Sequence, residues 1–303
     1  MMDYKLKIGL VTERRYLADW KTRKGIFAPK YAVENKNHIV KYIKDNFTDE
    51  NTAFVDLEWL NEEGLLSEVS DCAKVRDYFV KEGVNAIFII NCNFGNEEAA
   101  GTIAKMMNLP TLLWGPQDMR FDEDGGRFTD AQCGLFAISK QLKRLNVPFS
   151  YIENCQIEDE IFADGLKKFF SVATMVKNFK NLKVTQVGTR LNPFKSVMSN
   201  ELEITEKFGT NISTVNMTIF TQKLERLYKE KQGVLDVDLA RLKTQYDVGG
   251  LDDETLKRML TFVYAYIEVF EENDADVLLS ECWTSMPQAF NANPCLAMSI
   301  LYD

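Results

Sequence analysis

Short apolar runs alternate with segments of helical periodicity along the whole 303-residue chain, and this alternation restricts the fold more than any other feature. Apolar runs of about four to eight residues, bounded by polar turns, are typical of buried strands. Helical segments between such strands favour a sheet in which consecutive strands are parallel. The sequence therefore predicts an α/β protein made of open parallel sheets.

The first half of the chain carries five of these runs. The predicted strands are residues 6–11, 53–57, 85–93, 111–118 and 148–155. The predicted helices are residues 31–47, 67–81, 95–108, 131–145 and a long amphipathic segment over 157–178. The acidic run at 122–126 is interpreted as a solvated turn. This pattern predicts a Rossmann-like or flavodoxin-like domain over residues 1–165.

The second half repeats the alternation. The predicted strands are residues 183–189, 212–215 and 275–283, and the predicted helices are 196–208, polar helices between 220 and 243, and 253–272. Gly209 is placed to end the first of these helices. A last helix begins near Pro294, and the sequence stops inside it at Asp303. We expect a second domain of the same class over residues 166–303, truncated at its C-terminal end.

Composition excludes several classes of function. The net charge of -9 and the lack of a basic block argue against a nucleic-acid partner. The apolar run near the N-terminus is too short for a signal peptide or a membrane span, so we expect a cytoplasmic protein without membrane contact. The six cysteines show no CxxC spacing and are expected to be reduced thiols. His38 is the single histidine, which disfavours a Ser-His-Asp triad or a His-rich metal site.

Nucleotide-binding motifs are also absent from the sequence. No GxGxxG follows the first predicted strand, and no GxxxxGK[ST] occurs anywhere. The helix that begins at NFGNEE could offer amides to an anion, but Glu97 and Glu98 already occupy that positive end. A dinucleotide or P-loop site is therefore disfavoured.

Polar and aromatic side chains follow nearly every predicted strand. Ligands of open parallel sheets bind beyond the carboxyl ends of the strands. Amides and charged groups can exchange hydrogen bonds with hydroxyls, and an aromatic ring can cover the apolar face of a sugar. A polar small-molecule site is thus predicted, although strand ends are also polar simply because they meet water. The candidate residues are Arg14, Asn93, Phe94, Trp114, Gln117, Arg190, Asn192, Glu281 and Trp283.

Four long stretches resemble the L-fucose/L-arabinose isomerase-like family. They are IINCNFGNEEAAGTIAKMMNLPTLLWGPQD, CGLFAISKQLKRLNVPFSYIENC, VGTRLNPFKSVMSNELEITEKFG and ECWTSMPQAFNANPCLAMSILYD. The resemblance implies aldose–ketose isomerisation with Mn²⁺, through an ene-diol formed on a monosaccharide substrate. It also implies assembly into trimers or hexamers and a third, C-terminal domain.

The resemblance further implies how the candidate residues divide. The metal ligands are expected beyond residue 303, so the chain is expected to be a fragment that is inactive alone. Glu281 is the candidate catalytic residue, with a pocket wall or a structural hydrogen-bonding group as its alternative role. The other candidates are expected to contact substrate, and those of the first domain to act at a neighbouring subunit's site. A non-catalytic carbohydrate-binding module of two α/β domains is the alternative function.

Overall fold

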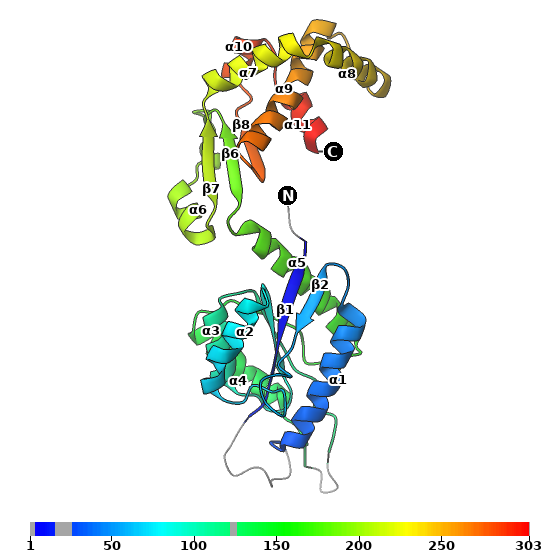
Figure 1. Ribbon diagram of the computed structural model, residues 1–303, viewed down its shortest axis with the longest axis vertical. Coiled ribbons are helices and arrows are strands. Elements are labelled where there is room, and N and C mark those ends of the chain that lie inside the picture. The colour runs from blue at the N-terminus through cyan, green and yellow to red at the C-terminus, as the bar shows by residue number, and fades with distance from the viewer. Residues whose placement is uncertain (1–3, 16–25, 122–125, 303) are drawn as a thin grey trace. The chain divides into compact units, whose positions relative to one another are not determined.

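The computed structural model of the chain describes residues 4–15, 26–121 and 126–302. These residues form two compact units whose boundary in the sequence lies between Lys177 and Asn178. We call them the N-terminal unit and the C-terminal unit. Each contains one parallel sheet with helices packed against it, which confirms the predicted class of tandem open α/β sheets (Figure 1). The predicted acidic turn at 122–126 lies almost entirely outside the described residues.

The N-terminal unit has five strands and five α-helices among its described residues. The strands are β1 (Leu6–Glu13), β2 (Thr52–Val55), β3 (Ala86–Asn91), β4 (Thr111–Trp114) and β5 (Ser150–Tyr151). The helices are α1 (Pro29–Phe47), α2 (Cys72–Lys81), α3 (Glu97–Met107), α4 (Ala131–Arg144) and α5 (Glu160–Phe179), with a 3₁₀ turn at Val69–Asp71. The predicted domain boundary at residue 165 lies inside α5, whereas the boundary between the two compact units lies near the end of that helix.

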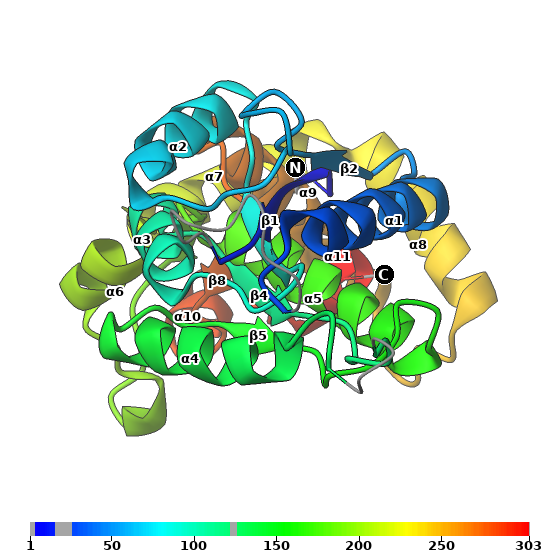
Figure 2. The same ribbon diagram turned by 90° about the horizontal axis from the view of Figure 1, so that it is seen from below.

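The five strands are parallel in the order β2-β1-β3-β4-β5, and helices cover both faces of the sheet (Figures 1 and 2). Successive side chains of a strand point to opposite faces. In β3, Phe88 and Ile90 therefore join the core under α1 and α5, while Ile87 and Ile89 join the core under α2, α3 and α4. All six residues of β3 are buried, as the continuous apolar run predicts for a central parallel strand.

Local sequence signals explain where α3 begins and ends. The side chain of Asn96 accepts hydrogen bonds from the backbone N–H groups of Glu98 and Ala99, which is the usual arrangement at a helix N-terminus. Asn108 ends the helix in the left-handed conformation. The first turn of α3 is thereby fixed directly behind the carboxyl end of β3.

The C-terminal unit has three parallel strands in the order β7-β6-β8. The strands are β6 (Lys183–Val187), β7 (Asn211–Val215) and β8 (Val277–Ser280). The helices are α6 (Glu201–Phe208), α7 (Met217–Glu230), α8 (Gln232–Gln245), α9 (Asp253–Glu272), α10 (Ser285–Phe290) and α11 (Cys295–Tyr302), with a 3₁₀ turn at Lys195–Val197. Its main core joins α7 and α9 through Phe220, Phe262 and Tyr266.

Two helices of the C-terminal unit differ from the sequence prediction. α6 begins at Glu201 rather than at residue 196, because the side chain of Asn200 caps it; Gly209 ends it in the left-handed conformation, as predicted. α10 lies between the predicted strand at 275–283 and the predicted helix near Pro294, where no helix was predicted, and its buried Met286 and Phe290 hold it on the core. Among the described residues, no helix is both long and apolar enough to cross a membrane.

Candidate functional site

The strand order of the N-terminal sheet reverses at β1, because β2 lies on one side of β1 and β3 on the other. Open α/β sheets bind ligands beyond the carboxyl ends of the strands at such a reversal. Here the two strands end side by side, with Glu13 paired to Asn91. The segments that follow β1 and β3 are therefore the first place to look for a site.

The side chain of Asn93 organises the segment after β3. Its Oδ1 accepts hydrogen bonds from the backbone N–H groups of Arg15 (3.1 Å), Phe94 (2.5 Å) and Gly95 (3.2 Å). Asn93 itself is fully buried. The structure thus places this predicted substrate-binding residue beneath the surface, where it connects the two segments that follow β1 and β3.

Phe94 and Arg15 form a partly exposed platform above Asn93. The guanidinium carbon of Arg15 lies 5.1 Å from the centroid of the Phe94 ring, and Arg15 also pairs with Glu97. Phe27, just before α1, packs against Phe94 with ring centroids 5.4 Å apart. An aromatic face held by a cation and a second ring is suited to cover the apolar face of a sugar.

Arg14 lies beside this platform but is almost wholly buried, with 5% of its surface exposed. Its Nε and Nη2 bind the carboxylate of Glu63 at 2.5 and 3.0 Å. This two-point ion pair fixes the guanidinium in one orientation and neutralises its charge. The guanidinium of Arg14 is thereby paired with a carboxylate of the N-terminal unit itself.

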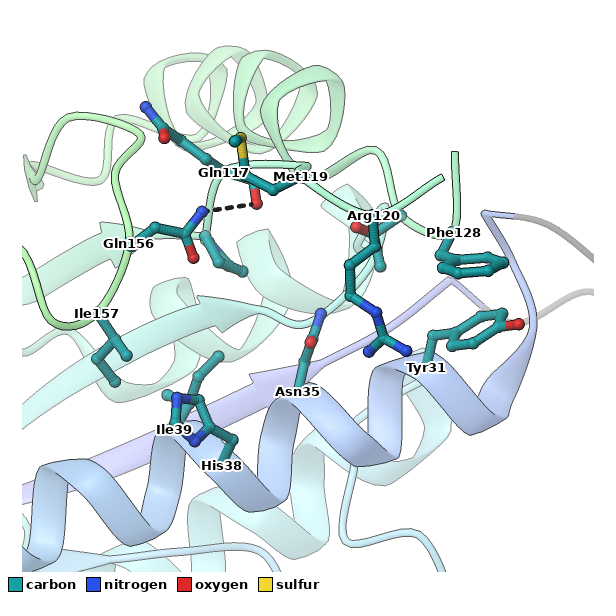
Figure 3. A pocket seen from close by; sticks show the side chains of 12 residues that line it. Tyr31, Asn35, His38, Ile39, Gln117, Met119, Arg120, Phe128, Gln156 and Ile157 are labelled. Carbon is teal, nitrogen blue, oxygen red and sulfur yellow. Dashed lines mark hydrogen bonds between the residues drawn. The ribbon is translucent and has the colours of Figure 1, made fainter. Parts of the chain in front are cut away.

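A pocket of about 100 Å³ opens between the first half of α1 and the segments that follow β4 and β5 (Figure 3). Three side chains of α1, namely Tyr31, Asn35 and His38, form one wall. Gln117 and Gln156, which follow β4 and β5, form the opposite wall. Gln117 is the one residue predicted from the sequence that lines this pocket.

The amide nitrogens of the pocket are engaged with the backbone. Asn35 donates to Cys92 O (2.9 Å), Gln117 donates to Asn154 O (3.0 Å), and Gln156 donates to Gln117 O (3.2 Å). Each amide therefore has its oxygen left to accept a hydrogen bond. Side-chain oxygens held in this way suit a ligand that is rich in hydroxyl donors.

A cation and two rings close one end of the same pocket. Tyr31 and Phe128 are stacked with centroids 4.1 Å apart, and the Arg120 guanidinium lies 5.5 and 5.4 Å from these two rings (Figure 3). Arg120 also pairs with Glu34 at 3.1 Å. At the other end, His38 is hydrogen-bonded to Glu158 at 2.8 Å, and its side chain is largely exposed. The pocket thus combines aromatic surface with charged and amide groups.

Trp114 does not line the pocket. It is fully buried on the α1/α5 side of the sheet, with its ring 4.6 Å from Phe162 of α5. Trp114 is the last residue of β4, so its side chain still follows the alternation of the strand and points to the same face as Leu112. The structure places this predicted substrate-binding residue in the hydrophobic core.

The C-terminal unit has a second pocket, of about 350 Å³, beside the ends of β6 and β8. Arg190 and Glu281, both predicted from the sequence, line it together with Thr189 and Phe194. Trp283 is exposed and packs against Phe194, with ring centroids 5.4 Å apart. The structure therefore brings these predicted residues to one end of the small sheet.

Arg190 holds the loop that follows β6. Its Nη1 donates to the backbone oxygens of Leu191 (2.7 Å), Asn192 (3.1 Å) and Phe194 (3.4 Å). Asn192 is exposed and enters these contacts through its backbone. The loop geometry around the pocket thus depends on one guanidinium.

Glu281 accepts four hydrogen bonds. Its Oε1 accepts from the hydroxyls of Ser285 (2.6 Å) and Thr284 (3.0 Å) and from Ser285 N–H (3.3 Å), and its Oε2 accepts from Thr189 N–H (3.3 Å). Partial burial raises the pKa of Glu281, but these donors outweigh it and lower the pKa below its ordinary value. The ionised carboxylate therefore joins the end of β6 to the start of α10.

Replacing Glu281 by alanine is expected to destabilise the C-terminal unit by about 1–2 kcal/mol at pH 7, because the donors lose a charged acceptor at a partly exposed position. A carboxyl with a lowered pKa contributes stability above its unfolded value of 4.5 and loses it as the pH falls through the folded pKa. The difference between wild type and Glu281→Ala in urea unfolding should therefore shrink below pH 4.5. Glu271→Ala, at an exposed position of α9, is the control and should change little. A difference that is constant with pH contradicts this role.

Among the described residues, no group of three or more histidine, cysteine, aspartate or glutamate side chains is placed to hold a metal ion. The described residues thus do not fit the Mn²⁺ that the resemblance implies. All six cysteines are unpaired.

Several residues of the N-terminal pocket and of the strand ends beside it were not predicted from the sequence. Tyr31 and Asn35 lie on α1 and Arg120 lies six residues beyond the end of β4, so strand ends alone give no signal for them. Glu13 and Asn91 stand at the ends of apolar runs, and their polarity within a buried stretch is a signal that could have singled them out.

Tandem parallel α/β units with amides, hydroxyls and arginines at their strand ends define a class of α/β proteins suited to polar small molecules. A family model described as "Fucose/sulfoquinovose isomerase, N-terminal domain" matches residues 20–180, which is more than half of the chain. The chain therefore belongs to the fucose isomerase-like family, and the resemblance predicted from the sequence is confirmed. Comparison with curated proteins found no match.

Proposed function

We propose that this chain takes part in the interconversion of an aldose and a ketose, and that its pockets bind the monosaccharide. Membership of the fucose isomerase-like family carries the proposal. The reaction moves a hydrogen from C2 to C1 of the aldose and a proton from the C2 hydroxyl to the C1 oxygen. The remaining hydroxyls are unchanged and serve as groups by which a protein holds the sugar.

The N-terminal pocket supplies acceptors for those hydroxyls. The oxygens of Asn35, Gln117 and Gln156 can each accept a hydrogen bond, since their nitrogens are held by backbone carbonyls. The platform of Arg15 and Phe94 adds an aromatic face at the same edge of the sheet. We assign these residues to binding and orientation, with the sugar as the substrate class.

We propose that Glu281 acts as a structural hydrogen-bonding group at the C-terminal pocket. Four donors already surround its carboxylate and favour the ionised form, which makes it a weak base. A structural hydrogen-bonding role is the alternative to catalysis that the sequence analysis left open for Glu281. Mn²⁺, when bound in this family, would polarise the sugar oxygens, and no described residue is assigned as its ligand. Assembly into trimers or hexamers and a cytoplasmic location remain predictions.

Calorimetric titration with L-fucose, L-arabinose and their ketoses, with and without MnCl₂, tests the proposal. We expect binding that weakens about 3- to 10-fold for Gln117→Ala and for Gln156→Ala, because each loses one hydrogen bond worth about 0.5–1.5 kcal/mol. Gln222→Ala, at an exposed position of α7, is the control and should bind like wild type.

The outcomes separate the two candidate functions. Sugar binding strengthened by MnCl₂ and accompanied by ketose formation supports an isomerase. Tight binding that is indifferent to the metal, with no conversion, supports the carbohydrate-binding module instead. Failure to bind any of these sugars refutes the assignment of the N-terminal pocket.

A further inference from the structure

Two polar side chains are buried together under the loop that carries Asn93 and Phe94. Glu13 ends β1 and Asn91 ends β3, and the two are direct partners in the parallel pair. Both are completely buried, on the side of the sheet covered by α2, α3 and α4. Buried polar groups are normally hydrogen-bonded, so each atom of this pair needs a partner.

The orientation of the Asn91 amide is fixed by its nitrogen. Nδ2 donates to the carbonyl of Ala131 (2.9 Å) and to the carbonyl of Phe94 (3.1 Å). Turning the amide over would place its oxygen against two acceptors. Asn91 Oδ1 therefore faces away from them, and it has no hydrogen-bond partner among the described residues.

Glu13 is in a similar situation. Its Oε2 accepts from the backbone N–H of Asn96 (2.8 Å), whereas its Oε1 is buried and has no partner among the described residues. A Cβ built on Gly95 would lie 2.6 Å from Glu13 Oε1 and 2.7 Å from Asn91 Oδ1. The two oxygens thus converge on the space that Gly95 leaves open.

Nearby charged groups do not supply the missing donor. Arg15 pairs with Glu97 through Nη2, and its buried Nε makes no hydrogen bond to either oxygen. The positive charge of Arg15 and the negative charge of Glu97 act on the pKa of Glu13 in opposite directions. Cys72 of α2 and Cys92 after β3 are the other titratable groups close to Glu13, and burial raises the pKa of both thiols, so they are uncharged. Lys36 of α1 is paired with Glu58.

We propose that Glu13 is protonated at neutral pH and donates its proton to Asn91 Oδ1, so that an uncharged acid–amide pair positions the loop of the sugar site. The pair ties β1, β3, the start of α3 and the start of α4 to this loop through Asn96 N–H, Phe94 O and Ala131 O. Glu13 is thus a positioning residue, and its effect on sugar binding rests on the proposed function.

The electrostatic environment supports this assignment. Burial raises the pKa of Glu13 to about 8 from an ordinary value of 4.5, although the Asn96 N–H and Arg15 oppose the rise. An acid with a raised pKa binds its proton in the folded state while it is ionised in the unfolded state. Folding stability therefore falls as the pH rises from 4.5 to 8 and does not recover above it.

Glu13→Gln tests the proposal, because glutamine reproduces the protonated acid: its oxygen accepts from Asn96 and its nitrogen donates to Asn91. In urea unfolding between pH 5 and 9, the unfolding constant of wild type should rise relative to that of Glu13→Gln by up to tenfold per pH unit below pH 8. Glu98→Gln makes the same charge change at an exposed position of α3. The unfolding constant of wild type relative to that of Glu98→Gln should not change over this pH range. Parallel profiles for wild type and Glu13→Gln overturn the proposal.

A second measurement uses the unaltered protein. The side-chain carboxyl carbon of Glu13, followed by NMR, should titrate near pH 8, and a carboxylate already ionised at pH 6 refutes the proposal even if the variant does not fold. In calorimetry, wild-type sugar affinity should fall above pH 8, whereas that of Glu13→Gln should not. If the unfolding and NMR measurements give the expected results but neither wild type nor Glu13→Gln binds sugar, the proposed function is refuted, whereas the protonated pair of Glu13 and Asn91 is supported.

Discussion

Replacing Gly134 by alanine should destabilise the N-terminal unit by about 3 kcal/mol or more, although alanine is the better helix former. A Cβ at this position of α4 would lie 1.5 Å from the carbonyl oxygen of Phe94 and 2.5 Å from Asn91 Nδ2. Relief requires the backbone to move, and severe overpacking costs about 1–3 kcal/mol or more. The gain in helix propensity, about 1 kcal/mol, is too small to offset this. Urea unfolding followed by circular dichroism measures the change.

Gly233→Ala is the matched control for this prediction. Gly233 also lies in a helix, α8, and a Cβ built there would meet no atom within 4 Å among the described residues. The same substitution should therefore stabilise the C-terminal unit by up to about 1 kcal/mol. The two variants are expected to shift in opposite directions. A neutral or stabilising Gly134→Ala would show that α4 does not press on the Phe94 loop as described.

The five-stranded sheet could be predicted from the sequence because its central strands β3 and β4 are short and buried on both faces. A run such as AIFIIN has no polar side to present to water, so it belongs in the centre of a parallel sheet. α10 was missed because its six residues are too few for a helical periodicity to be recognised. It is held by Phe290 in the core and by Glu281 at its start, and both contacts join it to other elements.

The candidate site could be predicted only in part, for a related reason. The strand-end rule locates Asn93, Gln117, Arg190 and Glu281 at sheet edges, and the structure finds them there. The rule does not show at which residue a strand ends, and a side chain before that point still alternates between the two faces of the sheet. Trp114 ends β4 and follows its alternation into the core. The rule also cannot show that Tyr31 lines the pocket, because that depends on how α1 packs against the sheet.

A fragment ending at Lys177 should fold, whereas one ending at Gly165 should be less stable by roughly 4 kcal/mol. The shorter fragment loses Leu166, Phe169 and Ala173, which α5 buries against the sheet in the same core as Trp114. Full burial of one large apolar side chain stabilises by about 1.5–3 kcal/mol, and two of these three residues are large. Urea unfolding of both fragments, followed by circular dichroism, measures the difference.

Point variants of the whole chain separate this packing from a simple effect of helix length. Phe169→Ala should cost about 3–5 kcal/mol, since the ring is 2% exposed. Met175→Ala, six residues further along α5, removes a side chain that is 68% exposed and should change the unfolding free energy by about 0.5 kcal/mol or less. If both fragments unfold with the same free energy and Phe169→Ala behaves like Met175→Ala, the second half of α5 does not belong to the N-terminal unit. Removing the second half of α5 lowers the unfolding free energy only if that half packs on the five-stranded sheet. Such a result would therefore place the boundary of the N-terminal unit near residue 165.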